Sequence, residues 1–130
     1  MILALLVGLG ASLGAVARYL LDQAVTRRRG PVFPAGTWVI NITGSLLLGF
    51  LMRFALATPA ISPEMRGFLT AGLCGGYTTF STFTFETMAL INDGEVARAS
   101  AYVAASVALS LLGVYLGAWA AGGLIMLRQR

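Results

Sequence analysis

Residues 75–84 read Gly75-Gly76-Tyr77-Thr78-Thr79-Phe80-Ser81-Thr82-Phe83-Thr84, so a glycine pair and six hydroxyl side chains lie together inside an apolar stretch. Glycine costs a helix about 1 kcal/mol relative to alanine, and threonine is also a weak helix former. We therefore expect an unwound stretch here, near the middle of a membrane. Irregular backbone at that depth persists only where protein buries it or water reaches it, and its free carbonyl groups are natural cation ligands.

The composition of the whole chain is that of an integral membrane protein. Of the 130 residues, 58% are apolar and 11% are charged, whereas a soluble domain carries about 25% charged residues. A membrane-spanning helix needs about 20 residues, and four apolar stretches fit that length, at about 2–24, 36–57, 67–91 and 97–126. We expect an all-α fold with one membrane domain over residues 1–130, in which the third of four spans is broken, located in the cell (inner) membrane.

The sequence excludes several kinds of site. It contains no His and a single Cys, Cys74, so no disulfide within the chain, zinc cluster or Cys–His pair can form. All nine basic residues are Arg, and they lie near the ends of the apolar stretches, where basic residues flank membrane helices. We therefore expect no nucleic-acid partner. We also expect no enzyme, because Glu86 is the only acid well inside a span and no base or nucleophile pair accompanies it.

The arginines give the chain no preferred orientation in the membrane. With four spans, one side of the bilayer holds Arg53, Arg66, Arg128 and Arg130. The other side holds Arg18, Arg27, Arg28, Arg29 and Arg98. Because orientation follows an imbalance of basic residues between the two sides, this near-balance leaves both orientations open. We expect two oppositely inserted copies to form an antiparallel homodimer around a two-fold axis in the membrane plane.

Small residues mark two helix faces that are suited to packing. The first span contains Gly10-x-x-x-Gly14, and the fourth contains Gly113-x-x-x-Gly117. In lipid, helices associate through close backbone contact at small residues, because the hydrophobic effect does not push them together. We expect both motifs to be helix–helix contacts and Cys74 to be a small packing residue.

Two spans carry polar stripes at helical spacing. The second span has Thr37, Asn41 and Ser45, and the fourth has Tyr102, Ser106 and Ser110. Residues four apart lie on one helix face. A hydroxyl stripe alone is explained by bonds to the helix's own carbonyls, but an Asn in mid-membrane needs partners or water. Together with the polar third span, the stripes favour a lined pathway over packing alone.

Phe80 and Phe83 share one helix face just beyond the expected break. A phenyl ring has a negative face and a positive edge. A pair of rings that turn their edges toward the same point can therefore contact a small anion.

Three blocks of sequence together carry a resemblance to a known family. They are Gly14-Ala15-x-x-Arg18-Tyr19, Gly36-Thr37-x-x-x-Asn41-x-x-Gly44, and the segment 75–83 followed by Glu86. In length, span number, charge balance and order of motifs, the chain closely resembles the Fluc (CrcB) fluoride channels. The segment in the third span is highly specific, whereas the glycines of the first span alone are a weak signal.

The resemblance implies an antiparallel homodimer with two fluoride pores, each built from both subunits, that conducts fluoride passively and excludes chloride. The pore residues that it implies are Asn41, Phe80, Phe83, Thr37, Tyr102, Ser106 and Ser110. It further implies one structural sodium ion (Na+), which is not transported and which is held by backbone carbonyls of Gly75 and Thr78 from both subunits. The partners that the resemblance implies are therefore a second copy of the chain, the fluoride ion and the lipid bilayer.

The sequence leaves the roles of two charged residues undecided, and it allows two alternative functions. Arg18 either draws anions into a vestibule or extends its side chain to the lipid headgroups. For Glu86 we expect a structural hydrogen bond or a position at a pore mouth. The alternative function is a small dual-topology multidrug exporter, but such exporters rely on an acid within the first span, and here the first acid is Asp22 at its end. A non-transporting membrane scaffold would leave the polar faces without a purpose.

Overall fold

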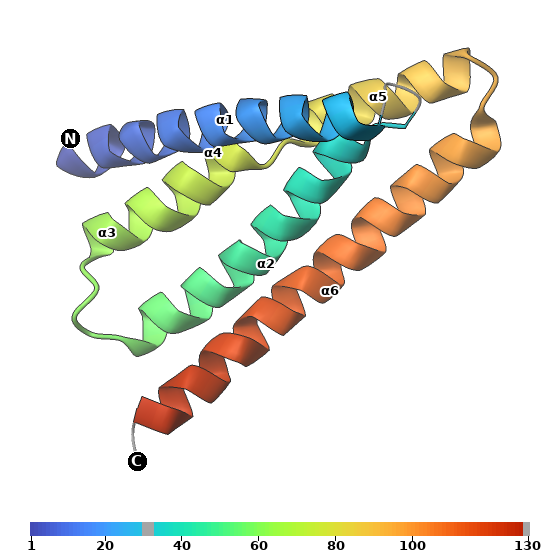
Figure 1. The fold of residues 1–130 in the computed structure, drawn as a ribbon. Coiled ribbons are helices and arrows are strands. Elements are labelled where there is room, and N and C mark those ends of the chain that lie inside the picture. The colour runs from blue at the N-terminus through green and yellow to red at the C-terminus, as the bar shows by residue number, and fades with distance from the viewer. Residues whose placement is uncertain (30–32, 129–130) are drawn as a thin grey trace.

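The computed structural model describes residues 1–29 and 33–128. Its helices are α1 (Ile2–Arg29), α2 (Ala35–Ala57), α3 (Pro63–Gly67), the π-helix η1 (Phe68–Cys74), α4 (Gly75–Tyr77), α5 (Phe80–Asn92) and α6 (Val96–Arg128) (Figure 1). Helices α1, α2 and α6 are each long and apolar enough to cross a membrane. The third span consists of the shorter pieces from α3 to α5, so the expected four-helix plan with a broken third helix is confirmed. Gly94, in the turn between α5 and α6, has a φ of 79°, which suits glycine. Of the residues discussed above, Arg130 lies outside the described residues.

Some helix ends differ from the expected spans. Helix α1 continues past residue 24 through the arginines to Arg29, because cations in the last turn complement the helix dipole. The third span begins at Pro63 rather than at about 67, because the Ser62 Oγ accepts a hydrogen bond from the Met65 N–H at 3.2 Å and Pro63 occupies the first helical turn. Both signals are present in the sequence, so these ends were predictable.

The break in the third span lies at Thr78 and Thr79, after the glycine pair. Thr78 (φ −83°, ψ 161°) and Thr79 (φ −151°, ψ 118°) have extended backbones. Gly75, with φ −64° and ψ −39°, is helical. The expected unwound stretch is therefore present, but threonines and not glycines form it. This agrees with the preference of β-branched residues for extended backbone.

The glycines of the third span serve contact with α1. A side chain on Gly76 would collide with the backbone of Ala11, and one on Gly72 would lie 3.1 Å from the Gly10 Cα. In return, a side chain on Gly14 would collide with the Leu73 carbonyl. The motif of the first span is thus a close helix–helix contact, as predicted, and the third span supplies small residues of its own.

The glycine motif of the fourth span forms the corresponding contact between α2 and α6. A Cβ atom on Gly117 would collide with the Leu46 carbonyl, and one on Gly113 would lie 3.1 Å from the Ile42 carbonyl oxygen. Gly49 of α2 has the same relation to the backbone of Val114. This prediction is also confirmed, and the two helices lie side by side along much of their length in Figure 1.

The π-helix η1 was not predicted. Its wider turn is visible where the Gly75 N–H reaches the Thr70 carbonyl, five residues back. Such turns are rare, and they occur frequently at functional sites. Here the π-helix lies against α1 and directly precedes the break.

The side chains are divided between a small core and an apolar exterior. The core cluster consists of Phe83, Leu90, Ala99 and Tyr102, where α5 meets α6. Cys74 is also buried, in keeping with a packing role. In contrast, Tyr115 is 75% exposed and Trp119 is 80% exposed in the single chain. Large apolar side chains on the outside of membrane-length helices suit contact with lipid or with a second subunit.

Candidate functional site

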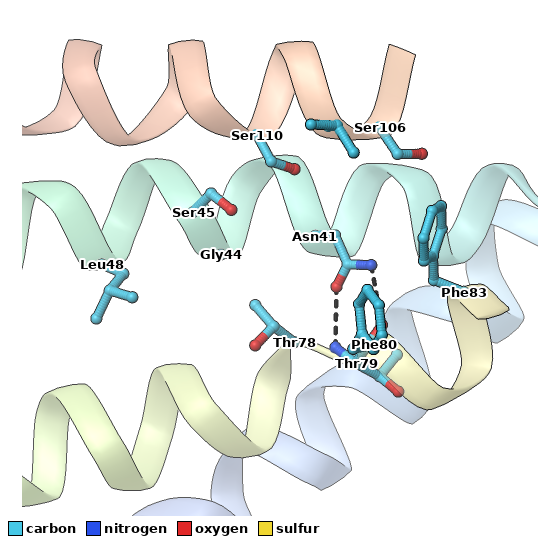
Figure 2. Close-up of a pocket in the computed structure, with 11 residues that line it drawn as sticks. Asn41, Gly44, Ser45, Leu48, Thr78, Thr79, Phe80, Phe83, Ser106 and Ser110 are labelled. Atoms are coloured by element: carbon cyan, nitrogen blue, oxygen red, sulfur yellow. Dashed lines mark hydrogen bonds between the residues drawn. The ribbon is translucent and has the colours of Figure 1, made fainter. Parts of the chain in front are cut away.

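An open pocket of about 290 Å³ lies between α2, α6 and the break in the third span. The residues that line it are Asn41, Gly44, Ser45, Leu48, Thr78, Thr79, Phe80, Phe83, Ser106, Val107 and Ser110 (Figure 2). None of these side chains is charged. The polar groups that face the pocket are therefore amides, hydroxyls and backbone groups.

Five of the seven predicted pore residues line this pocket. They are Asn41 from α2, Phe80 and Phe83 from α5, and Ser106 and Ser110 from α6. Asn41 and Ser45 lie four residues apart on α2, and Ser106 and Ser110 lie four residues apart on α6, so each pair shares one helix face. The close contact of α2 with α6 brings the two faces together. The structure thus brings the two polar stripes to the same side of the molecule as the break.

The Asn41 side chain is hydrogen-bonded to the backbone of the break. Its Nδ2 donates to the Thr79 carbonyl at 3.0 Å, and its Oδ1 accepts from the Thr79 N–H at 2.9 Å (Figure 2). A carboxamide has two N–H donors, so one of them is not used by this pairing. Asn41 therefore both supports the break and lines the pocket.

Ser106 presents a hydroxyl without a partner. The residue is only 6% exposed, and its Oγ has no hydrogen-bond partner within residues 1–29 and 33–128. A buried polar group in this state costs about 1–3 kcal/mol relative to a bonded one. Such an arrangement suits a group whose partner is a ligand.

Phe80 and Phe83 lie together, as their spacing predicts. Their ring centroids are 5.7 Å apart, and the rings are tilted by 43°. Phe83 is 8% exposed, whereas Phe80 is 77% exposed in the single chain. The pair therefore has one ring in the protein core and one ring on the open face of the subunit.

The start of α5 also lies at the pocket. Thr79 caps this 13-residue helix, because its Oγ1 accepts from the Thr82 N–H at 3.2 Å. The N-terminal end of a helix carries partial positive charge and favours anions. Sequence reasoning missed this feature, although Thr is one of the residues that commonly cap the N-terminus of a helix. Together with the neutral donors, the helix end makes the pocket suitable for an anion.

Thr37 and Tyr102, the other two predicted pore residues, do not line this pocket. Thr37 Oγ1 donates to one carboxylate oxygen of Glu86 at 2.9 Å, and the Tyr102 hydroxyl donates to the other at 2.9 Å. Both residues are buried, and each hydroxyl has one hydrogen to donate. The structural hydrogen bond expected for Glu86 is confirmed, and its carboxylate joins α2, α5 and α6.

The Glu86 cluster, which we define as Thr37, Glu86 and Tyr102, connects the first pocket to a second one. The rings of Phe83 and Tyr102 are 5.2 Å apart. Glu86 lines a second pocket of about 460 Å³, together with Asp22, Thr26, Phe33, Pro34, Ala89, Leu90, Asp93, Glu95 and Arg98. A continuous series of contacts therefore runs from the first pocket through Phe83 and Tyr102 to Glu86 and the second pocket.

Arg18 lies on the other side of the break. It lines a pocket of about 160 Å³ with Ala15, Tyr19, Asp22, Thr37, Ile40, Thr79 and Thr82. Thr79 faces both this pocket and the first one. Arg18 is therefore close to the polar backbone of the break, although it does not reach the pocket that the predicted pore residues line.

The two residues predicted to hold sodium differ in position. Thr78 lines the first pocket and ends the helix, whereas Gly75 lies within the last helical turn and does not line it. The Thr79 N–H, which would reach the Gly75 carbonyl in an unbroken helix, instead donates to Asn41. The Gly75 carbonyl oxygen therefore lacks the N–H that would bond to it in a helix. A free carbonyl oxygen is a suitable ligand for a hard cation.

Comparisons with known proteins agree on one family. A family model described as CrcB-like protein, Camphor Resistance (CrcB), matches residues 5–118, a range that contains all the residues discussed as pore or sodium ligands. A fluoride-specific ion channel FluC from Rhizobium meliloti (strain 1021) is 50% identical over 113 residues, which cover 87% of this chain and 90% of that protein.

Two further relatives carry the same name. The protein from Geobacter sulfurreducens is 49% identical over 110 residues, which cover 85% of this chain and 89% of that protein. The protein from Anaeromyxobacter sp. (strain K) is 44% identical over 122 residues, which cover 91% of this chain and 97% of that protein. With these matches and its long apolar helices, the chain is a multi-pass membrane protein that belongs to the CrcB family.

Proposed function

We propose that this chain conducts fluoride passively across the membrane, excludes chloride, and so lowers the fluoride concentration in the cytoplasm. Relatives that align over most of its length are named fluoride-specific ion channels. The observation that carries the proposal is the pocket at the break. There, neutral donors and two phenyl rings converge with the Ser106 hydroxyl, which has no hydrogen-bond partner among the described residues.

The chemistry of the pocket suits fluoride in particular. Fluoride is small and strongly hydrated, so a selective pore must replace its water with hydrogen-bond donors. The amide of Asn41, the hydroxyls of Ser106 and Ser110, and the polarised ring edges of Phe80 and Phe83 are such groups. A fixed cation in this pocket would retain the anion, and none of the residues that line the pocket is charged.

The proposed route continues from the first pocket past Phe83 to Tyr102 and Thr37. The contact between the rings of Phe83 and Tyr102, and the opening of the second pocket at Glu86, support this direction. In the structure the hydroxyls of Tyr102 and Thr37 are bonded to Glu86. They become available to an anion only when these bonds are exchanged. Arg18 is a vestibule residue in this proposal.

The functional unit that we propose is an antiparallel homodimer with two pores. The balanced arginines allow both orientations. The pocket is open on one side, and Phe80, Tyr115 and Trp119 are exposed around the single subunit. A second, inverted copy is a suitable cover for these apolar groups, and it would bring a second Phe80 toward the first.

Labelling of an introduced cysteine tests the dual orientation. The native Cys74 is buried, so an Asn92→Cys variant at the exposed end of α5 offers one reactive thiol. In whole cells, a membrane-impermeant maleimide is expected to label about half of the molecules, because nearly equal numbers of arginines on the two sides give no preferred orientation. Complete labelling or none would mean a single orientation and would exclude the antiparallel dimer.

We further propose that the backbone carbonyls of Gly75 and Thr78 from both subunits hold one structural sodium ion. The missing helical donor of Gly75 and the extended backbone of Thr78 support this assignment. Sodium, when bound, supplies the positive charge that satisfies these carbonyls and links the two subunits.

A pair of neighbouring glycine variants tests the sodium site. A Cβ atom on Gly75 would lie 3.9 Å from the Thr70 carbonyl, whereas one on Gly76 would collide with the Ala11 backbone. We therefore expect Gly75→Val to fold. Because a β-branched residue disfavours the helical backbone that Gly75 adopts, the variant should shift the Gly75 carbonyl and lose the rise in melting temperature that sodium gives to the dimer, measured against choline. Gly76→Ala is expected to disturb packing in both salts. A rise in melting temperature with sodium equal to that of the wild type in Gly75→Val would contradict a sodium site at Gly75.

Fluoride efflux from liposomes that contain the purified protein tests the proposed function itself. We expect fast fluoride release and negligible chloride release, without dependence on a proton gradient. Chloride release at a similar rate would contradict selectivity. Transport that requires a proton gradient would favour the multidrug exporter instead. Protein-free liposomes are the control for leakage.

A further inference from the structure

Asn41 pairs with both backbone groups of a single residue. The two hydrogen bonds to the N–H and the carbonyl of Thr79, at 2.9 and 3.0 Å, join residues that are 38 positions apart in the sequence. Thr79 has the extended backbone of a β-strand, and the carboxamide occupies the place that a neighbouring strand takes in a sheet. A side chain thus satisfies the backbone of an irregular segment inside the membrane, where water is scarce.

This pairing begins where the helical hydrogen bonds stop. The Thr78 N–H still donates to the Cys74 carbonyl at 3.0 Å, as in a regular helix. The next donor along the chain, the Thr79 N–H, would reach the Gly75 carbonyl if the helix continued, but it is bonded to Asn41. Asn41 therefore competes directly with the helix for this N–H.

Helix α2 also provides space for the break beside Asn41. Gly44, one turn further along α2, has no side chain, and the methyl group of Thr78 lies against it. The Tyr77 ring lies on the same glycine. One face of α2 thus holds Thr79 by hydrogen bonds and Thr78 by close packing.

We infer that Asn41 is a positioning residue that holds the third span open at Thr79, keeps the Gly75 carbonyl available to a cation, and fixes the start of the helix that carries Phe80. The last two consequences rest on the proposed function. The first, the stabilisation of the open break, rests only on the geometry around Thr79. Asn41 links the proposed pore to the proposed sodium site, because Thr79 immediately follows Thr78 and immediately precedes Phe80.

Amide hydrogen exchange at Thr79, measured by NMR on the purified protein in lipid nanodiscs with sodium and without fluoride, tests this inference. In Asn41→Ala the exchange rate of the Thr79 amide is expected to rise by about tenfold, as for the loss of one hydrogen bond. Ser45→Ala is the matched control, because Ser45 lies on the same face of α2 and lines the same pocket. It should leave this rate within about twofold of the wild type.

A second variant separates the two hydrogen bonds. Asn41→Asp keeps an acceptor for the Thr79 N–H and loses the donor to the Thr79 carbonyl. We expect the Thr79 amide to stay protected to within about threefold of the wild type, because its own bond is retained. If Asn41→Ala does not fold, this variant decides the question, since loss of protection in Asn41→Asp would overturn the inference.

Sodium dependence gives an independent readout. In Asn41→Ala the sodium concentration needed for half of the rise in melting temperature is expected to increase about tenfold, because the carbonyls at the break are no longer held in one arrangement before sodium binds. Unchanged Thr79 exchange in Asn41→Ala, or an equal increase in Ser45→Ala, would overturn the positioning role. A wild-type protein that conducts no fluoride would refute the proposed function and leave the exchange result intact.

Discussion

The pocket at the break and the Glu86 cluster lie on either side of Phe83 and contain similar polar residues. They differ in whether the hydrogen-bond donors of these residues are already used. In the pocket at the break, the Ser106 hydroxyl has no partner among the described residues, and one N–H of the Asn41 amide is not used by its pairing with Thr79. In the Glu86 cluster, the hydroxyls of Thr37 and Tyr102 are both donated to the carboxylate.

This difference shows that a count of hydroxyls along a helix does not locate an ion path. Thr37 and Asn41 belong to one stripe on α2, and Tyr102 and Ser106 to one stripe on α6, yet each stripe divides between the two regions. An anion at the break meets donors that are ready to bind it. An anion at the Glu86 cluster must compete with a carboxylate for every donor.

The largest effect on fluoride flux is expected at the two phenyl rings, Phe80 and Phe83. Phe80→Ile or Phe83→Ile removes a ring edge from the pocket, and fluoride flux should fall by roughly a hundredfold, which equals about 2.7 kcal/mol of barrier. Efflux from liposomes measures this, with size-exclusion chromatography to show that the dimer remains assembled. Phe85→Ile is the control, because Phe85 is on the same helix, is 65% exposed, and does not line the pocket. Undiminished flux in both pore variants would refute the role of the rings.

A smaller effect on stability is expected in the Glu86 cluster. Tyr102→Phe removes the donor to one carboxylate oxygen. The free energy of unfolding should fall by about 1–3 kcal/mol, because a partly buried carboxylate loses a partner. Denaturation in detergent measures this. Tyr19→Phe, which alters a tyrosine that is 63% exposed and lies outside the cluster, should change stability by less than about 0.5 kcal/mol. Equal stability of the two variants would mean that the cluster is not structural.

The smallest effect is expected at Ser106, and it should concern flux alone. Ser106→Ala removes a buried hydroxyl that has no partner within the described part of the chain, so stability should be unchanged or slightly higher. Fluoride efflux should fall by about fivefold, equivalent to about 1 kcal/mol. Ser100→Ala, at an exposed position of the same helix, should affect neither. A loss of stability without a loss of flux in Ser106→Ala would reverse the comparison between the two regions.

Much of this architecture was predictable from the sequence, because it depends on local periodicity. The four spans follow from apolar length, and the contacts of Gly14 and Gly117 follow from small-residue spacing. The polar stripes on α2 and α6 follow from polar residues at every fourth position, and both stripes contribute to the lining of the first pocket. The weak helix propensity of segment 75–84 correctly indicated a break.

The remaining features depend on tertiary partners that periodicity does not specify. The glycines were expected to contribute to the break, but Gly76 is helical. Its lack of a side chain allows close contact with the backbone of Ala11 instead. The bonding of Thr37 and Tyr102 to Glu86, and of Asn41 to Thr79, joins residues far apart in the chain. A single sequence names the donors in these bonds but not their acceptors.

We expect fluoride to rest at the break, among neutral donors and ring edges. Solid-state ¹⁹F–¹H dipolar contacts, recorded on the lipid-reconstituted protein loaded with fluoride, test this most directly. We expect contacts from bound fluoride to the side-chain amide of Asn41 and to ring protons of Phe80 and Phe83. Contacts confined to Thr37 and Tyr102, or to arginine side chains, would contradict it.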